Sequence, residues 1–438
     1  MRFQYWIVSC LLLLLLQIDA RSEDWSRWMG PNRDNTWNET GIIDKFPEGG
    51  PKVLWESKVA IGYSGPAVAQ GKVIVTDFVS DANVKIANFE RRKFEGTERI
   101  ICLNEDDGKE VWKYEYPVRY AISYPSGPRC TPIIEGNHVY TLGAEGNLCC
   151  LKLDSGDVVW QKELKKEYKT NSALWGYSAH PLIDGDNLIT LAGGDGSHIV
   201  ALNKKTGAEV WKALSAPEQG YAPPAIIEHA GKRQLISFRP GFVSSIDPTN
   251  GKENWTVPYE ATSGSVIMTP IKFKNFLYVA GYSKKSMLLK LADDNSAPSV
   301  VWQSEGKIAV SPVNVQPFLD SKNGIVYGLD QTGDMRAMKI EGPELLWATS
   351  EPVSKRRVGS GTAFIVRQAD RFWLFNENGE LIIANLTPEG YQEIDRAKVI
   401  EASNNAFNRP VVWSMPAFAN KRIYIRNDDK IVSLDVAK

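Results

Sequence analysis

The chain lacks the sequence motifs that identify most enzyme classes. It contains no G-x-S-x-G nucleophile elbow, no G-x-x-x-x-G-K-[ST] phosphate loop and no H-E-x-x-H metal motif. Histidine is also scarce, and its four positions do not have the i, i+2 or i, i+4 spacing of a metal-binding pair: His138, His180, His198 and His229. The sequence therefore predicts no catalytic residue and no metal ligand.

A surplus of charge of one sign is missing as well. Lys and Arg number 51 against 52 Asp and Glu, a formal net charge of −1, so no basic domain points to nucleic acid as a partner. Five cysteines are present and none forms a C-x-x-C pair: Cys10, Cys102, Cys130, Cys149 and Cys150. Those that follow the N-terminal apolar segment permit disulfides in an exported chain but do not make a disulfide scaffold.

The only long apolar run lies at the N-terminus. Arg2 precedes a run from Tyr5 to Ile18, and Ala20 follows as a small residue at a cleavage point. This order is typical of a secretory signal, and the run is shorter than the about 20 residues that a spanning helix needs. We predict a signal peptide over 1–20, an N-terminal extension over 21–50, and a mature chain without a transmembrane span that is secreted or periplasmic. An uncleaved membrane anchor is the alternative.

The sequence has an internal repeat instead of a catalytic motif. Four segments align without gaps over eleven residues: CLNEDDGKEVW (102–112), CLKLDSGDVVW (150–160), ALNKKTGAEVW (201–211) and SIDPTNGKENW (245–255). The glycine at the seventh place predicts a tight hairpin turn with positive φ. The terminal tryptophan is a large side chain suited to filling the gap between neighbouring sheets.

The repeat recurs along the chain with a nearly constant period. The positions of the tryptophan type are Trp55, Trp112, Trp160, Trp211, Trp255, Trp302, Trp347 and Ile394. Gaps of 44 to 57 residues, with about four strands in each, predict eight four-stranded antiparallel blades of a β-propeller over 51–438. The last unit stops before its final strand, while PKVLW (51–55) precedes any complete blade. We therefore expect the N-terminal strand to complete the last blade and close the ring, which also hides two sheet edges.

These residues resemble the repeat of the quinoprotein-type, or PQQ-like, β-propeller family. The likeness covers almost all of 51–438 and is strongest in GNHVYTLGAEGNLCCLKLDSGDVVW (136–160) and GSHIVALNKKTGAEVW (196–211). The opening DWSRWMGPNRDNTW (24–37) resembles exported bacterial proteins with PQQ-binding-like repeats. The resemblance implies an all-β, quinoprotein alcohol dehydrogenase-like fold, related in architecture to WD40 and YVTN repeats. BamB-type outer-membrane assembly propellers, which are scaffolds, share the repeat with quinoprotein dehydrogenases, which are enzymes, so it indicates the fold and not the function.

One vicinal cysteine pair bears on the enzyme alternative. In quinoprotein dehydrogenases the resemblance implies PQQ between a tryptophan and a vicinal disulfide, with Ca²⁺ held by acidic and amide side chains. Cys149 and Cys150 are adjacent, but Cys150 takes the slot that Ala201 and Ser245 fill elsewhere, and adjacent strand residues point to opposite faces. We expect two buried structural thiols and no cofactor; a PQQ-dependent oxidoreductase with bound Ca²⁺ is the alternative.

The segments that enter the innermost strands are rich in aromatic and cationic residues. In a propeller these segments surround the mouth of the central funnel, and here they supply Tyr63, Tyr124, Arg129, Trp175, Tyr177, His180, Tyr221, Arg409 and Trp413. Such groups suit a flat or anionic ligand, unless the rings pack between blades and the arginines pair with carboxylates. We predict a monomeric, exported, non-enzymatic binding or scaffold propeller that engages envelope proteins or a small or glycan ligand. A glycan-handling protein is a further alternative.

Overall fold

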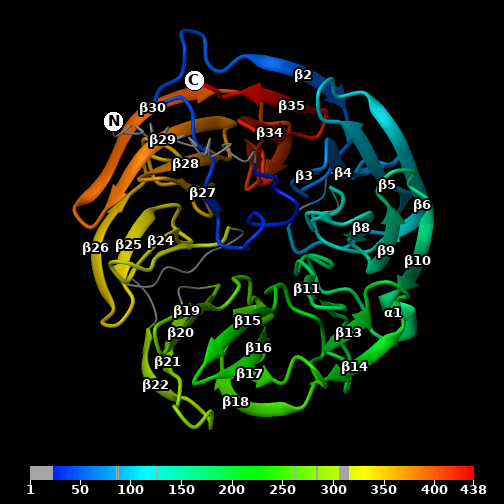
Figure 1. Cartoon of the computed structure of the whole chain (residues 1–438), viewed down its shortest axis with the longest axis vertical. Helices are drawn as coiled ribbons and strands as arrows, with labels where there is room; N and C mark the ends of the chain where they lie inside the picture. The colour runs from blue at the N-terminus through cyan, green and yellow to red at the C-terminus, as the bar shows by residue number, and fades with distance from the viewer. Residues whose placement is uncertain are drawn as a thin grey trace, which may run out of the picture.

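The computed structural model describes residues 23–84, 86, 88–124, 126–260, 262–282, 285–304 and 315–438. Over this range eight β-sheets surround a central axis, which confirms the predicted all-β, eight-bladed propeller (Figure 1). The predicted signal peptide lies outside the described residues. Among the residues described, no helix has both the length and the apolar character required to cross a membrane.

The first four blades follow one another along the chain, each with its innermost strand first. Blade 1 consists of β3 (Ala67–Ala69), β4 (Lys72–Val79), β5 (Phe94–Asn104) and β6 (Glu110–Tyr120). Blade 2 consists of β7 (Ile133–Glu135), β8 (His138–Leu142), β9 (Asn147–Lys152) and β10 (Val158–Glu163), followed by the one-turn helix α1 (Leu164–Glu167). Blade 3 consists of β11 (Leu182–Asp184), β12 (Asn187–Leu191), β13 (Ile199–Asn203) and β14 (Glu209–Ala213). Blade 4 consists of β15 (Ala225–His229), β16 (Lys232–Arg239), β17 (Gly241–Ile246) and β18 (Glu253–Tyr259), followed by the 3₁₀ turn η1 (Thr262–Gly264).

The remaining blades continue around the ring. Blade 5 consists of β19 (Ile271–Phe273), β20 (Phe276–Gly281), β21 (Lys285–Lys290) and β22 (Ser299–Ser304). Blade 6 consists of β23 (Phe318–Asp320), β24 (Ile325–Leu329), β25 (Met335–Lys339) and β26 (Glu344–Thr349). Blade 7 consists of β27 (Ala363–Gln368), β28 (Arg371–Asn376), β29 (Glu380–Thr387) and β30 (Gly390–Lys398). A ribbon of β31 (Asn404–Ala406) and β32 (Arg409–Val411) leads to blade 8, with β33 (Ala417–Ala419), β34 (Arg422–Arg426) and β35 (Lys430–Asp435).

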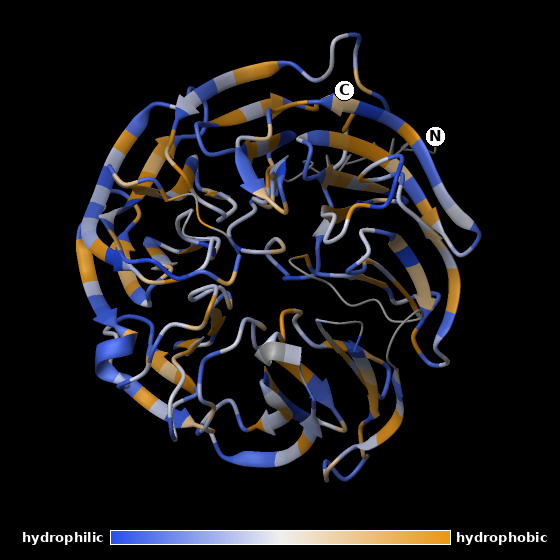
Figure 2. Cartoon of the chain, turned by 180° about the vertical axis from the view of Figure 1, so that it is seen from behind, coloured by the Kyte–Doolittle hydropathy of each residue, from blue (hydrophilic) through white to orange (hydrophobic). Residues whose placement is uncertain are grey.

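Burial explains why the strands of one blade differ in sequence. The middle strands β12 and β13 are covered on both faces by neighbouring blades, and they read as nearly continuous apolar runs, NLITL and IVALN. The outermost strand β14 alternates between exposed and buried residues (EVWKA) because one face meets solvent. The same mixture of hydrophilic and hydrophobic residues marks the outer strands around the rim (Figure 2).

The two ends of the chain close the ring, as predicted. Strand β2 (Val53–Lys58) pairs antiparallel with β35 and supplies the outermost strand of blade 8, with Trp55 opposite Ser433. In Figure 1 the blue strand β2 accordingly runs beside the red β35. Residues about 380 positions apart in sequence therefore form one sheet, and β2 gives blade 8 the four strands that its neighbours have.

Blade 7 carries a fifth strand that the sequence did not predict. Strand β1 (Thr36–Trp37) pairs in parallel with β27 on the inner side of this blade. It belongs to a segment, here called the N-terminal strap (residues 23–50), which crosses the centre of the ring (Figure 1). The strap bonds to the inner strands of several blades: Trp25 pairs with Val68 of β3, and the Ser26 carbonyl accepts a hydrogen bond of 2.8 Å from the Ile134 N–H of β7.

The repeat tryptophans join each blade to the next. Trp160 of blade 2 donates its Nε1–H to the Lys204 carbonyl of blade 3 at 3.0 Å and covers Gly207, whose φ is 71°. A Cβ at Gly207 would lie 2.8 Å from the indole, which explains the glycine of the repeat. The same bond to the next blade is made by Trp55, Trp112, Trp211, Trp302 and Trp347. Trp255 instead donates to Gln234 in its own blade, and Ile394 packs partly buried without a polar bond.

Candidate functional site

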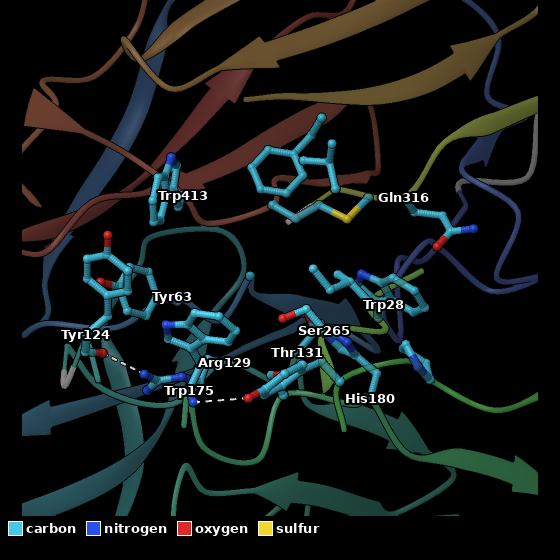
Figure 3. Close-up of a pocket in the computed structure, with 18 of the residues that line it drawn as sticks. Trp28, Tyr63, Tyr124, Arg129, Thr131, Trp175, His180, Ser265, Gln316 and Trp413 are labelled. Carbon is cyan, nitrogen blue, oxygen red and sulfur yellow. Dashed lines mark hydrogen bonds between the residues drawn. The ribbon is translucent and has the colours of Figure 1, made fainter. Parts of the chain in front are cut away.

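A pocket opens where the chain enters the innermost strands (Figure 3). In six blades the residue two positions before the innermost strand lines it: Gly65, Thr131, His180, Pro223, Gln316 and Met415. The cavity holds about 240 Å³. Because nearly every blade contributes the same position, the pocket is a product of the ring itself, and its chemistry is set by side chains that differ from blade to blade.

Seven of the nine predicted funnel residues line this pocket: Tyr63, Tyr124, Arg129, Trp175, His180, Tyr221 and Trp413. Tyr177 does not line it, because its ring packs against Gly146 in the blade core and its hydroxyl donates to the Ala192 carbonyl at 3.0 Å. Arg409 is also absent from the lining, because its guanidinium pairs with the buried Glu377 at 2.7 Å. These two residues therefore follow the alternative given above, in which an aromatic ring packs within the blades and an arginine pairs with a carboxylate.

The aromatic walls form two groups. In the first, Trp413 contacts Tyr63, Tyr124 and Phe407, with ring centroids 6.2, 5.9 and 6.1 Å apart. In the second, Trp175 lies 5.3 Å from Tyr221 and 5.7 Å from Phe89. Offset and edge-to-face arrangements of this kind leave ring faces free for a further flat group between them.

Among the lining residues that sequence reasoning missed, four lie in segments outside the blade repeat. Asn88 and Phe89 belong to the long connection between β4 and β5 of blade 1, and Phe407 lies in the turn between β31 and β32. Trp28 belongs to the strap. All four lie outside the blade repeat, so the period that located the other residues carries no information about them. Aromatic residues in segments outside the repeat are the signal that would have found three of them.

Three of the pocket aromatics have left-handed backbone conformations. The φ angles are 69° at Phe89, 47° at Tyr124 and 51° at Phe407, a region that bulky side chains rarely adopt and that costs about 1–3 kcal/mol per residue. Phe89 and Phe407 remain 61% and 42% exposed, so packing offsets little of this cost. At Phe407 the conformation belongs to the two-residue turn between β31 and β32, because Asn408 also has a positive φ of 60° and turns of this kind require it at both positions.

The strap forms the floor of the pocket. Trp28 stacks on His180, with centroids 4.4 Å apart and an interplanar angle of 12°, and the Arg33 guanidinium lies 5.5 Å from the Trp28 ring. Arg33 donates to the carbonyls of Pro181 at 2.7 Å and Pro224 at 3.3 Å. Burial lowers the pKa of Arg33 to about 9, so it stays protonated at neutral pH. The positive charge of Arg33 is therefore held next to the Trp28 indole, which lines the pocket.

Arg129 is the cation in the wall of the pocket. It lies 5.3 Å from the Tyr63 ring and donates to the backbone carbonyls of Ser123 at 3.0 Å, Tyr124 at 2.5 Å and Gly127. Neither Asp nor Glu is found among the lining residues of the described chain. The carboxyl behind this wall is Glu98, which accepts hydrogen bonds from two tyrosine hydroxyls and from the Ala144 N–H, and burial raises its pKa. The pocket wall thus carries a cation without a paired carboxylate.

Burial moves the pKa values of three pocket tyrosines and of the pocket histidine further from neutral pH. Burial raises the pKa of Tyr63 and of Tyr221, and raises that of Tyr124 to about 12. Burial, helped by the Arg33 charge, lowers the pKa of His180 well below its usual value of 6.5. At neutral pH these tyrosines and the imidazole are uncharged, whereas general acid–base catalysis is most effective with a pKa near the working pH. The arrangement suits binding.

The residues present do not fit the PQQ and Ca²⁺ arrangement of the quinoprotein dehydrogenases. The described lining offers no carboxylate for Ca²⁺. Cys149 packs between blades 1 and 2 with Trp112, whereas Cys150 packs between blades 2 and 3 with Trp160. Both thiols are free and buried, and burial raises their pKa to about 12. Because the pair points into two different interblade cores, it does not form a lid over the pocket.

Fold and pocket together define a PQQ-like propeller with an aromatic central pocket. A family model described as outer membrane protein assembly factor BamB matches residues 96–336, more than half of the chain. The chain therefore belongs to this family.

Sequence relatives carry the same family name, and solved structures share the fold. BamB of Yersinia pestis is 24% identical over 272 residues, which is 57% of this chain and 62% of that protein, so the match spans less than two thirds of its length. BamB of Shewanella oneidensis is 21% identical over 70% of this chain and 72% of its own. The crystal structure of BamB from Moraxella catarrhalis superposes with a TM-score of 0.57 at 18% identity, over 88% of this chain and 99% of that one. Quinohemoprotein alcohol dehydrogenase ADHIIG of Pseudomonas putida gives 0.59 at 10% identity, over 94% and 80%. At such identities these structures show the fold alone.

Proposed function

We propose that this protein is an exported, non-enzymatic propeller that binds proteins of the cell envelope and serves as a scaffold in their assembly. One observation carries the choice of binding over catalysis. The tyrosines and the imidazole discussed above are held uncharged at neutral pH, and the described pocket lining contains no carboxylate or thiol to act as their partner. The choice of partner is supported by membership of a family described as outer-membrane assembly factors.

Site-specific photocrosslinking in cells that express the full chain tests the scaffold role. A photoreactive residue is introduced at Val210 on β14 or at Val300 on β22, which are 49% and 50% exposed on outer strands. The buried Val200 of β13 is the matched control position. We expect crosslinks to outer-membrane proteins from at least one exposed position and none from the control. Crosslinks to cytoplasmic proteins only, or none at either exposed position, would contradict the proposal.

A titration of the purified protein with PQQ and Ca²⁺ tests the non-enzymatic part. Heat and quinone absorbance are followed together, and dye-linked oxidation of alcohols and sugars is assayed on the same sample. We expect no saturable binding that depends on Ca²⁺ and no turnover. Calcium-dependent micromolar binding of PQQ together with dye reduction would contradict the proposal and would indicate a quinoprotein oxidoreductase instead.

A further inference from the structure

We infer that the central pocket is a binding site for a planar aromatic anion of one or two rings, with its acidic group on Arg129 and its ring between the aromatic walls. The inference rests on the binding half of the proposed function and deepens it. It does not depend on the scaffold half, which the photocrosslinking experiment tests separately.

The size of the pocket limits the ligand. The cavity of about 240 Å³ lies just below the range of about 300–1,000 Å³ that is common for drug-sized ligands. Trp28 lines it, and so do the two aromatic groups: Trp413 with its neighbours, and Trp175 with Tyr221. A flat group of one or two fused rings matches a cavity of this size, and Figure 3 shows Trp413, Tyr63, Tyr124 and Trp175 around it.

The available hydrogen-bond donors select an anion. A guanidinium has five N–H groups, and the bonds of Arg129 to Ser123, Tyr124 and Gly127 use both on Nη2 and one on Nη1. Its Nε–H and its second Nη1–H have no partner among the described residues. With no acidic side chain in the described lining, a ligand carboxylate or sulfonate would supply the missing negative charge.

Two amide side chains of the pocket are already engaged with the protein, whereas the buried His180 Nδ1 has no hydrogen-bond partner among the described residues. The Gln316 amide bonds in both directions to the backbone of Thr269, at 2.8 and 3.0 Å. The Asn88 Oδ1 accepts from the Trp175 indole at 3.0 Å and from the Phe89 N–H. Neither amide is therefore fully available to the many hydroxyl groups of a sugar, and the aromatic walls with Arg129 favour an aromatic anion. A cationic ligand is disfavoured by Arg129 itself.

The rim of the pocket connects its aromatic rings to its cation. Phe89, Tyr124 and Phe407 all hold their rings at the pocket in left-handed backbone conformations, and two of them stay largely exposed. Tyr124 also offers its carbonyl to Arg129, so the same backbone turn orients both the ring and the cation. Such coordination of ring and charge is what a ligand with an aromatic face and an acidic group requires.

Calorimetric titration of the purified full chain with three matched probes tests the inference. The probes are 2-naphthoate, its neutral isostere 2-naphthamide, and cyclohexanecarboxylate, which keeps the charge and lacks the aromatic ring. We expect saturable binding of 2-naphthoate and at least about tenfold weaker binding of each other probe, because one charge-assisted hydrogen bond and one stacked ring each contribute roughly that factor. The comparison is made on the unaltered protein, so it does not depend on any variant folding.

Variants then locate the site. Phe407→Ala should weaken 2-naphthoate by about tenfold, whereas Phe242→Ala should leave it unchanged. Phe242 is the matched control: it is 40% exposed against 42%, an arginine lies over its ring at 4.8 Å against 5.4 Å, and it does not line the pocket. Arg129→Gln should make the acid and the amide bind equally. Equal binding of acid and amide by the unaltered protein, equal loss in both phenylalanine variants, or saturable binding of oligosaccharides without 2-naphthoate would overturn the inference.

Discussion

Many aromatic side chains of this propeller lie in two concentric sets around its axis, here called the outer ring and the inner ring. The two sets use the same residue types in opposite ways. Around the outside, tryptophans such as Trp160 are buried, bond to the next blade and cover a turn glycine. Around the centre, Phe89 and Phe407 are exposed and strained. The outer ring lowers the free energy of the folded state, whereas the inner ring raises it at several positions. An aromatic residue therefore says little about its role until its burial and backbone are known.

The largest expected effect comes from truncating one tryptophan of the outer ring. Trp160→Ala removes a buried indole and its bond to Lys204, and we expect a loss of about 3–5 kcal/mol in the free energy of unfolding. Trp175→Ala, in the pocket, should cost clearly less stability and should abolish the binding of aromatic ligands. Denaturant unfolding and calorimetry on both variants check this. Equal stability losses would erase the distinction between the rings.

A single methyl group probes the same outer contact. Gly207→Ala combines a φ of 71° with a Cβ 2.8 Å from the Trp160 indole, and we expect a loss of about 2 kcal/mol. Gly231→Ala is the control, because its φ is 72° but no atom lies within 4 Å of the new Cβ. The difference between the two unfolding free energies isolates the contact. If both variants lose the same amount, the backbone alone explains the glycine.

The free energy of unfolding should depend on pH through Glu98, which lies behind the pocket wall, and not through the tryptophans of the outer ring. Burial raises the folded-state pKa of this carboxyl above 4.5, so its stabilising contribution is complete below about pH 4.5 and is lost as pH rises through the folded-state pKa. The slope is at most about 1.4 kcal/mol per pH unit, and Glu98→Gln should remove it. Trp160→Phe changes an uncharged contact and should leave the slope intact. Unfolding free energies between pH 4 and 8 provide the measurement, and an unchanged slope in the glutamine variant would contradict it.

The smallest effect has the opposite sign. Phe407→Gly relieves a left-handed conformation at a ring that is 42% exposed, so we expect a gain of about 1 kcal/mol together with weaker ligand binding. Phe242→Gly, in the strand β17 without positive φ, should lose about 0.5–1 kcal/mol. Thermal unfolding of the two variants in parallel is sufficient. A loss of stability at Phe407 would mean that its ring packs more than its exposure indicates.

The blade repeat made most of the fold predictable. CLKLDSGDVVW places a strand, a glycine turn and a tryptophan in order, and β9, β10 and Trp160 follow it. The repeat also placed Cys150 in a slot for small residues, and both cysteines of the pair are buried and free. The fifth strand of blade 7 was not predictable, because the strap lies outside the repeat and pairs with residues 331 positions away.

The candidate site was predictable only where it coincides with the repeat. His180 precedes its innermost strand at the shared position, so the period led to it. Tyr177 lies three residues earlier in the same loop, where the direction of the side chain depends on packing against Gly146. Arg409 carries the right charge but meets Glu377 from a different segment of the chain. Contacts of this kind depend on the tertiary structure, so the spacing of residues in the sequence does not predict them.

The pairing of β2 with β35 also sets an order of events in biosynthesis. Blade 8 needs residues from both ends of the chain, so its sheet is incomplete until Asp435 has left the ribosome. Until β35 is complete, β2 has no strand to pair with. The ring therefore closes only when β2, near one end of the described chain, meets β35 near the other, so closure is the strand pairing with the greatest separation in sequence.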